Sequence, residues 1–267
     1  MLPLWDNIPS ERFPFVNYAI IASCVVAFLI QLSAPQGDDS MVLEYAMIPY
    51  RVTHPSQSQI VVEERSPTGQ VEQHVVDLES HSPGWVTLVT CMFLHGGWMH
   101  IIGNMWFLYI FGDNIEDRFG HLGYAIMYLI SGLAAGLMHI ATDGMSLVPT
   151  IGASGAIAGV MGAYLLLYPR AMVMTLIPFG VFSRMVPVPA PIFLGIWFVF
   201  QLFSGLQPAS GGGGGVAWWA HVGGFVAGLG MTAALRQLGA LYPAPETRYP
   251  IDNRSPRMEF PPWQRPY

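Results

Sequence analysis

Residues 151–170 read IGASGAIAGVMGAYLLLYPR, and no charge interrupts them before Arg170. After Ser154, small residues that fall on one helical face recur at Gly155, Ala158, Gly159 and Gly162. Ser154 precedes Arg170 by 16 residues, which is about 24 Å along a helix. Because a hydrocarbon core is about 30 Å thick, this helix would begin below one membrane surface. Its free N–H groups would then require water in a cavity or a bound oxyanion.

The whole chain is too apolar and too poorly charged for a water-soluble protein. Of its 267 residues, 52% are hydrophobic and 10% are charged, and the mean hydropathy is +0.43. Soluble domains carry about 25% charged residues. An aromatic content of 13% argues against disorder, and a net charge of −6 argues against a nucleic-acid partner. The composition therefore predicts an all-α polytopic membrane protein.

Apolar runs of about 20 residues, the length that crosses a bilayer, predict six membrane-spanning helices. They are Phe15–Leu32, Gly97–Phe111, His121–Ala141, Gly152–Tyr168, Pro191–Leu206 and Val216–Leu235. Arginines predict the orientation, since a cytoplasmic N-terminus leaves only Arg51 and Arg65 on outer segments. We therefore predict a six-helix membrane domain over residues 15–238. Residues 1–14 and the proline-rich, unfolded tail 239–267 would be cytoplasmic.

Three segments between the spans carry predictions of their own. The long first outer loop, residues 33–84, alternates polar and apolar residues at 59–62 and 73–78, so a small exposed hairpin is expected there. Val86–Leu94 is apolar but short, which predicts a segment at the membrane interface. Ala171–Val186 is interrupted by proline, glycine and arginine, so we expect a loop that lies along the membrane.

Polar side chains inside the spans are costly and mark candidate functional positions. His221 follows an interfacial Trp-Trp pair and shares a helical stripe with the glycines three and seven residues after it. If this stripe packs against the small residues after Ser154, imidazole and hydroxyl come within hydrogen-bond reach. His100 and Asn104 are four residues apart, on one face of the second span. Alone, that pair would indicate only a hydrogen-bonded contact between helices.

Together these residues permit nucleophilic catalysis. A serine hydroxyl needs a base to take its proton, and histidine is the usual base, so Ser154 and His221 are predicted to form a dyad. The Ser154 N–H and the side chains of His100 and Asn104 are candidates for stabilising the oxyanion of a tetrahedral intermediate. No HExxH pattern or carboxylate partner accompanies the histidines, so neither a metal nor a cofactor is expected.

Three motifs, in this order and spacing, resemble those of the rhomboid family of intramembrane serine proteases. They are His95-Gly-Gly-Trp-Met-His100-Ile-Ile-Gly-Asn104, Gly152-Ala-Ser154-Gly155 and Ala220-His221-Val-Gly-Gly224. The segment Glu116-Asp-Arg118-Phe-Gly120 agrees as well. The resemblance covers about residues 85–237 closely and the first span loosely.

The resemblance implies hydrolysis of peptide bonds in or near a transmembrane segment of another protein. Ser154 would be the nucleophile and His221 the general base. His100 and Asn104 would line the oxyanion hole, and Gly152 would permit the tight turn before the serine. The partners implied are single-span membrane proteins and the lipid bilayer. The protein would lie in the cell (inner) membrane, with its site open to the extracytoplasmic side.

The chain departs from the family pattern at two positions. Many bacterial members carry a tyrosine four residues after the serine, packed on the histidine ring, where this chain has Ala158. Many also carry a Trp-Arg pair in the first outer loop, whereas here Trp85 is followed by Val86. The loop Gln207–Gly215, next to the family's lateral entry, ends in five glycines and is expected to be a mobile cover.

Other interpretations are open from the sequence. One is a non-catalytic rhomboid-like protein that binds transmembrane clients, although such relatives usually lose one member of the dyad. A solute channel would need polar residues that continue to the inner side, whereas here they cluster in the outer third. A mitochondrial member would be expected to carry an Arg-rich presequence. His95 and His139 are expected to be structural, and the cysteines to be packing residues.

Overall fold

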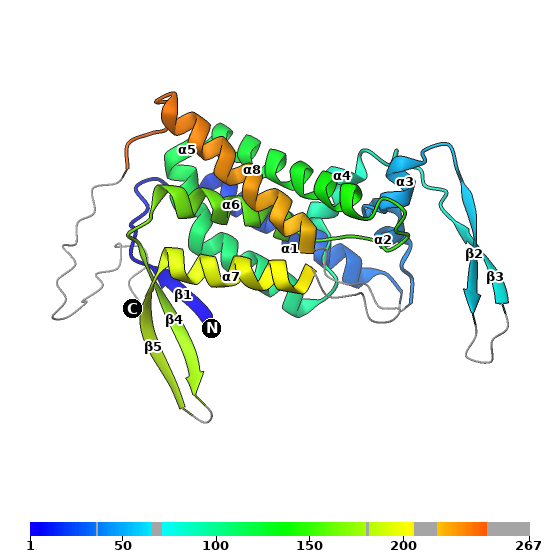
Figure 1. Ribbon diagram of the computed structural model, residues 1–267, viewed down its shortest axis with the longest axis horizontal. Coiled ribbons are helices and arrows are strands. Elements are labelled where there is room, and N and C mark those ends of the chain that lie inside the picture. The colour runs from blue at the N-terminus through cyan, green and yellow to red at the C-terminus, as the bar shows by residue number, and fades with distance from the viewer. Residues whose placement is uncertain (36, 66–70, 180–181, 206–217, 245–267) are drawn as a thin grey trace.

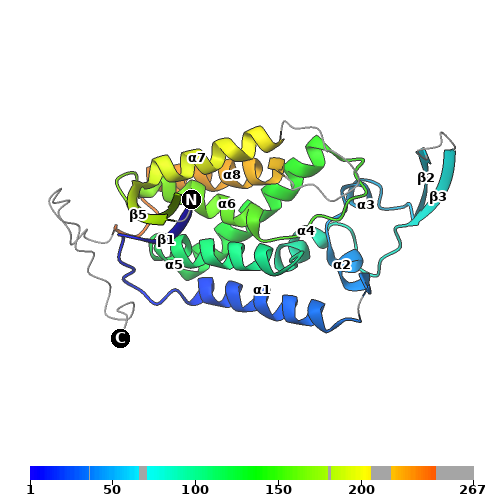
Figure 2. The same ribbon diagram turned by 90° about the horizontal axis from the view of Figure 1, so that it is seen from below.

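A computed structural model describes residues 1–35, 37–65, 71–179, 182–205 and 218–244. Five long helices pack side by side in an elongated bundle (Figures 1 and 2): α1 Phe15–Ser33, α5 Trp98–Thr142, α6 Ser154–Leu167, α7 Ala190–Gly205 and α8 Trp218–Gln237. Short helical segments precede α5: α2 Ser40–Tyr45, α3 Pro49–Thr53, α4 Thr87–Thr90 and the 3-10 turn η1 Cys91–Phe93. The described part of the chain is mostly helical, as predicted.

Helix α5 contains two of the predicted spans. A break in the backbone at Gly120, with φ +70° and ψ +165°, separates them. The first half runs to Phe119, past the predicted end at Phe111. The polar residues after Phe111 stay helical because they cap another helix. The Glu116 carboxylate accepts hydrogen bonds from the N–H groups of Val16 and Asn17, at 2.9 and 2.8 Å. These are donors that the first turn of α1 leaves free.

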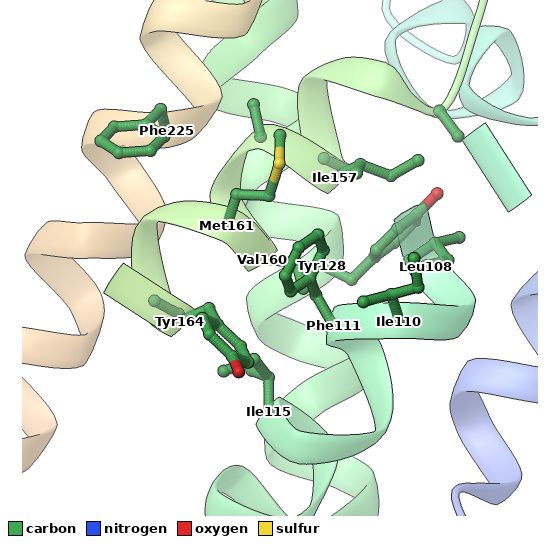
Figure 3. Packing of buried hydrophobic residues seen from close by; sticks show 14 of the residues in the cluster. Leu108, Ile110, Phe111, Ile115, Tyr128, Ile157, Val160, Met161, Tyr164 and Phe225 are labelled. Carbon is green, nitrogen blue, oxygen red and sulfur yellow. The ribbon is translucent and has the colours of Figure 1, made fainter. Parts of the chain in front are cut away.

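Two helices of the described residues, α1 and α5, are long and apolar enough to cross a membrane. Helix α6 and residues 190–200 of α7 are apolar but shorter. Helix α6 is central and buried over Gly155–Tyr164. Figure 3 shows Ile157, Val160 and Met161 packed among side chains of α5 and α8. Six membrane crossings therefore stay a prediction.

Two small antiparallel sheets depart from the all-α prediction. Strands β2 (Gln59–Arg65) and β3 (Val71–Asp77) form the hairpin expected within residues 33–84. Strands β4 (Met172–Phe179) and β5 (Phe182–Pro189) form a second hairpin, and β1 (Leu2–Asp6) pairs with β4. Figure 1 shows the two sheets at opposite ends of the bundle.

The second hairpin lies where a loop was predicted over Ala171–Val186, so the expected irregular backbone was wrong, while the course of this segment along the membrane stays a prediction. Pro178, taken as a breaker, lies one residue before the end of β4 and so interrupts no buried ladder. Val173 and Thr175 are both buried. Buried side chains at every second position are expected of a strand with one covered face.

The predicted unfolded tail, residues 239–267, is described up to residue 244. There the Tyr242 N–H donates to the Arg118 carbonyl oxygen at 2.9 Å and the Arg118 Nε donates to the Tyr242 carbonyl oxygen at 2.7 Å, so the prediction was wrong for this part. The tail from residue 245 onward and the loop Gln207–Gly215 lie outside the described residues.

Candidate active site

Helices α6 and α8 approach each other along the two predicted glycine stripes. A methyl group built on Gly224 would lie 1.9 Å from the carbonyl oxygen of Gly155, and one on Gly228 would lie 2.1 Å from that of Gly159. Side chains cannot be accommodated at such distances, so the two backbones are in direct contact. This contact fixes the relative position of the residues at the start of each helix.

The close approach brings Ser154 and His221 together. Ser154 is the first residue of α6, and His221 lies one turn into α8. The His221 Nε2 and the Ser154 Oγ are 2.7 Å apart, a hydrogen bond between residues 67 positions apart in sequence. His221 is 7% exposed. The geometry that the glycine pattern predicted is therefore present.

Gly152 and His100 form the wall of the turn before Ser154. Gly152 has φ +124°, a conformation that favours glycine, and a methyl group there would lie 2.7 Å from the His100 Nε2. The Gly96 N–H donates to the His100 Nδ1 at 3.2 Å. Because Nδ1 accepts this bond, the proton of the neutral ring resides on Nε2. The Nε2–H donor therefore lies against the turn that leads into Ser154.

Asn104 lies one turn after His100 on α5 and is buried. Its Nδ2 is a buried donor without a hydrogen-bond partner among the described residues. Asn104 is not among the residues that line the cavity at Ser154. The structure thus brings Gly152, Ser154, His221 and His100 together, and places Asn104 behind His100.

A cavity of about 440 Å³ opens at the Ser154–His221 pair. Small side chains from the second half of α5 form one wall: Gly132, Ala135 and Gly136. Thr150 and Ile151 from the strand-like segment before α6 form another, with Met47 from residues 33–84. Such a lining leaves room for an extended peptide backbone or for water beside the hydroxyl.

Two tryptophans flank the His221 ring, and neither contact was predicted from the sequence. The Trp197 ring of α7 lies 6.0 Å from it between centroids, at 41°, and the Trp218 ring lies 6.1 Å away, at 84°. Trp218 precedes His221 by three residues, so the helical period could have indicated this contact. The contact of Trp197 could not be predicted from the residues around it in sequence, because it depends on how α7 packs against α8.

His95 has the structural role that was expected. Its N–H donates to the Gln31 Oε1 at 3.0 Å, and the Gln31 Nε2 donates to its carbonyl oxygen at 3.2 Å. Its Nδ1 lies 3.3 Å from the Phe93 carbonyl oxygen. Its ring meets the His100 ring edge-to-face, with centroids 5.1 Å apart. His95 therefore connects α1 to the segment that carries His100. Among the described residues, no group of side chains is arranged to bind a metal ion.

Comparison with known proteins places the chain in a family. A profile described as Rhomboid domain matches residues 82–238, more than half of the chain. RHOMBOID-like protein 5 of Arabidopsis thaliana is 40% identical over 78 residues, which are 29% of this chain and 25% of that protein. Two further relatives come from the same plant, and each aligns with 29% of this chain. Rhomboid-like protein 11, chloroplastic, is 39% identical over 27% of its own length. RHOMBOID-like protein 6, mitochondrial, is 40% identical over 25% of its own length. The chain thus aligns with only about a quarter of each relative, and its profile match shows that it belongs to the rhomboid family.

Proposed function

We propose that this chain is an intramembrane serine protease that hydrolyses peptide bonds in or near transmembrane segments of other membrane proteins. The observation that carries the proposal is the 2.7 Å contact between the Ser154 Oγ and the His221 Nε2, at a cavity inside a rhomboid domain. A structural serine cap would need neither an imidazole at that distance nor an open cavity beside it.

The geometry supports an acyl-enzyme mechanism. Ser154 donates its hydroxyl proton to the His221 Nε2 while Oγ attacks the scissile carbonyl carbon. The resulting tetrahedral oxyanion needs preorganised donors. The Ser154 N–H, free at a helix start, and the His100 Nε2–H beside the turn are suited to this role. His221 then protonates the leaving amine, and water, activated by the same imidazole, hydrolyses the acyl-enzyme.

Asn104 is proposed as a further oxyanion donor. Its Nδ2 is a buried donor that no described residue accepts from, and such a group costs about 1–3 kcal/mol unless a ligand pairs with it. A donor left unpaired one turn after His100 on the same helix is consistent with one that is reserved for the transition state.

The membrane arrangement is part of the same proposal. Six helices would cross the bilayer, with both termini on the cytoplasmic side and the cavity open to the extracytoplasmic side, as the arginine distribution favours. The names of two relatives place them in chloroplasts and in mitochondria, so members of this family occur in more than one compartment. For this chain we propose the cell (inner) membrane, with single-span proteins as substrates.

Cleavage of a panel of single-span substrates by the purified, detergent-solubilised chain tests the proposal. Wild type should cut at least one member, and Ser154→Ala should cut none. Ser23→Ala is the matched control, because the exposed Ser23 hydroxyl bonds only the carbonyl oxygen of Ala19, and it should cut like wild type. Equal cleavage by Ser154→Ala would end the protease proposal. Substrate binding without cleavage by wild type would instead favour a non-catalytic, client-binding role.

A further inference from the structure

The sheet β1–β4–β5 has one face that is apolar except for Ser183, next to the turn of the β4–β5 hairpin. The register places Leu2 opposite Leu176, and Leu176 opposite Met185. The neighbouring row on the same face is Trp5, Met174 and Pro187. Leu2 is 48% exposed and Met185 is 61% exposed, so both side chains lie on the surface of the described part of the chain.

The opposite face of the sheet is fixed to the helices. Val173 and Thr175 are fully buried on it. Asp6, which pairs with Val173, accepts hydrogen bonds from the Tyr164 hydroxyl of α6 and from the Asn114 Nδ2 of α5. The apolar face of Leu2, Leu176 and Met185 is therefore turned away from the bundle.

A side-chain hydrogen bond sets the level of the sheet along the bundle. The Trp106 Nε1 of α5 donates to the carbonyl oxygen of Pro3 at 2.6 Å. In the proposed membrane arrangement the second span ends on the cytoplasmic side at Phe111, and Trp106 lies five residues before it, which is about 8 Å along the helix. Strand β1 thus runs beside the half of α5 that would lie in the cytoplasmic leaflet. Figure 1 shows the hairpin leaving the bundle sideways at that end, beside the start of α7.

The composition of this sheet differs from that of the other hairpin. Strands β4 and β5 carry one charged residue in sixteen, Arg184, close to their turn. Strands β2 and β3 carry five in fourteen: Glu63, Glu64, Arg65, Glu72 and Asp77. Both hairpins have exposed strands, so the contrast indicates different surroundings. An arginine near the tip can extend its charge to a polar layer while its stem stays in an apolar one.

The edges of the sheet also suit an apolar environment. An unpaired backbone donor or acceptor is costly in lipid. Edge strand β5 contains Pro187 and Pro189, which have no N–H to leave unpaired. On edge strand β1, Pro3 likewise lacks an N–H, and its carbonyl oxygen is paired with Trp106.

We propose that the sheet β1–β4–β5 inserts its Leu2–Leu176–Met185 face into the cytoplasmic leaflet of the lipid bilayer, as a second membrane-contacting surface beside the helices. The inference rests on the membrane arrangement of the proposed function. The exposed apolar side chains of α7 at the same end, such as Ile192, continue this surface toward the bundle, so sheet and helix would share one lipid boundary.

Spin labels on single introduced cysteines in phospholipid vesicles test the proposal. Met185→Cys and Leu2→Cys report on two strands of the apolar face. Val26→Cys on α1 is the lipid reference and Val61→Cys on β2 is the aqueous reference, since both side chains are more than half exposed. Wild type gives the background, because its Cys24 and Cys91 are buried. The measured quantity is the ratio of collision rates with O₂ and with a water-soluble nickel chelate.

The proposal predicts that the ratio at Met185→Cys and Leu2→Cys is several-fold higher than at Val61→Cys and approaches that at Val26→Cys. If both report water while Val26→Cys reports lipid, the sheet proposal is wrong and the bundle arrangement stands. If Val26→Cys also reports water, the membrane arrangement itself fails. The two failures are thus distinguishable in one set of spectra.

Discussion

The His221 ring is held between two aromatic side chains from different helices. Trp218 belongs to the same helix and fixes the ring from one side, while Trp197 reaches it from α7. Ala158, where many bacterial members carry a supporting tyrosine, is too small to reach out from its buried place in α6. We therefore expect Trp197 to be a positioning residue, whose contact keeps Nε2 aimed at the Ser154 hydroxyl.

Replacing Trp197 with alanine should lower kcat by up to about tenfold with little change in KM. Aromatic contacts contribute about 0.5–1.5 kcal/mol, and 1.36 kcal/mol is a factor of ten in rate. Trp197→Phe should recover most of the loss, since a ring remains. Trp85→Ala, at an exposed tryptophan, is the control and should be neutral. A rise in KM alone after Trp197→Ala would point to substrate binding instead of base positioning.

At the residue scale, the sequence predicted the contact between Ser154 and His221, because small residues follow both of them at helical spacing. The small residues after Ser154 and after His221 predict close helix contact, and the 2.7 Å bond follows from it. Sequence reasoning could not identify Trp197, because nothing in the local pattern of α7 specifies which side faces α8. It also did not reveal that Asn104 stands behind His100 and outside the cavity lining.

At the scale of elements, the α6–α8 contact tolerates no side chain at its glycines. Gly228→Ala should force the helices apart, at a cost of about 1–3 kcal/mol, and should lower both Tm and the cleavage rate. Gly230→Ala, two residues further along the same helix, meets nothing within 4 Å and should leave both unchanged or raise Tm slightly. Thermal unfolding in detergent measures the difference. Equal Tm values for the two variants would contradict the direct backbone contact.

The stability of the contact between β1 and the helices α5 and α6 should depend on pH, because it involves the Asp6 carboxyl. Burial raises the pKa of Asp6 from 3.8 to about 7, while the hydrogen bond from Tyr164 opposes that rise. The folded state therefore favours the protonated carboxyl, so its stabilising contribution is complete below about pH 4 and declines as the pH rises toward 7. Asp113 on α5 is the neighbouring carboxyl and adds repulsion once both ionise.

Hydrogen exchange of the β1 amides measures this effect. Protection at pH 8 should be lower than at pH 5 in wild type, after normalisation to Asp6→Asn at the same pH. Asp6→Asn keeps the shape of the side chain and cannot ionise, so its own protection should not follow the titration. A flat normalised profile between these two pH values would show that Asp6 does not govern the docking of β1.

The elements were predicted unevenly, for a physical reason. Apolar runs and glycine stripes are local, so the helices were found close to their observed bounds. The continuation of α5 to Phe119 was missed because Glu116 there satisfies backbone donors of α1. The β4–β5 hairpin was missed because Pro178, Gly180 and Arg184 were interpreted as interruptions of the segment. Its pairing with β1 could not be predicted either, because β1 lies some 170 residues away in sequence and strand formation depends on such partners.

At the scale of the whole molecule, the bundle has two chemically distinct ends. One carries the cavity, His100 and the charged β2–β3 hairpin, and the other carries the apolar sheet and the Glu116 carboxylate that caps α1. Composition alone predicted a membrane protein, because 10% charged residues cannot cover a soluble surface. The assignment of the two ends to the two sides of a bilayer depends on the arginine distribution, whereas the spin-label experiment measures whether α1 and the apolar sheet lie in lipid.

The central claim is that His221 activates the Ser154 hydroxyl. Reaction of the folded, detergent-solubilised chain with a fluorophosphonate, followed by mass spectrometry of the modified peptide, measures this directly. The account predicts modification at Ser154 in wild type, slower by at least about a hundredfold in His221→Ala, the contribution expected of a general base. Modification of Ser154 at the same rate in both proteins, or none at Ser154 in folded wild type, would contradict it.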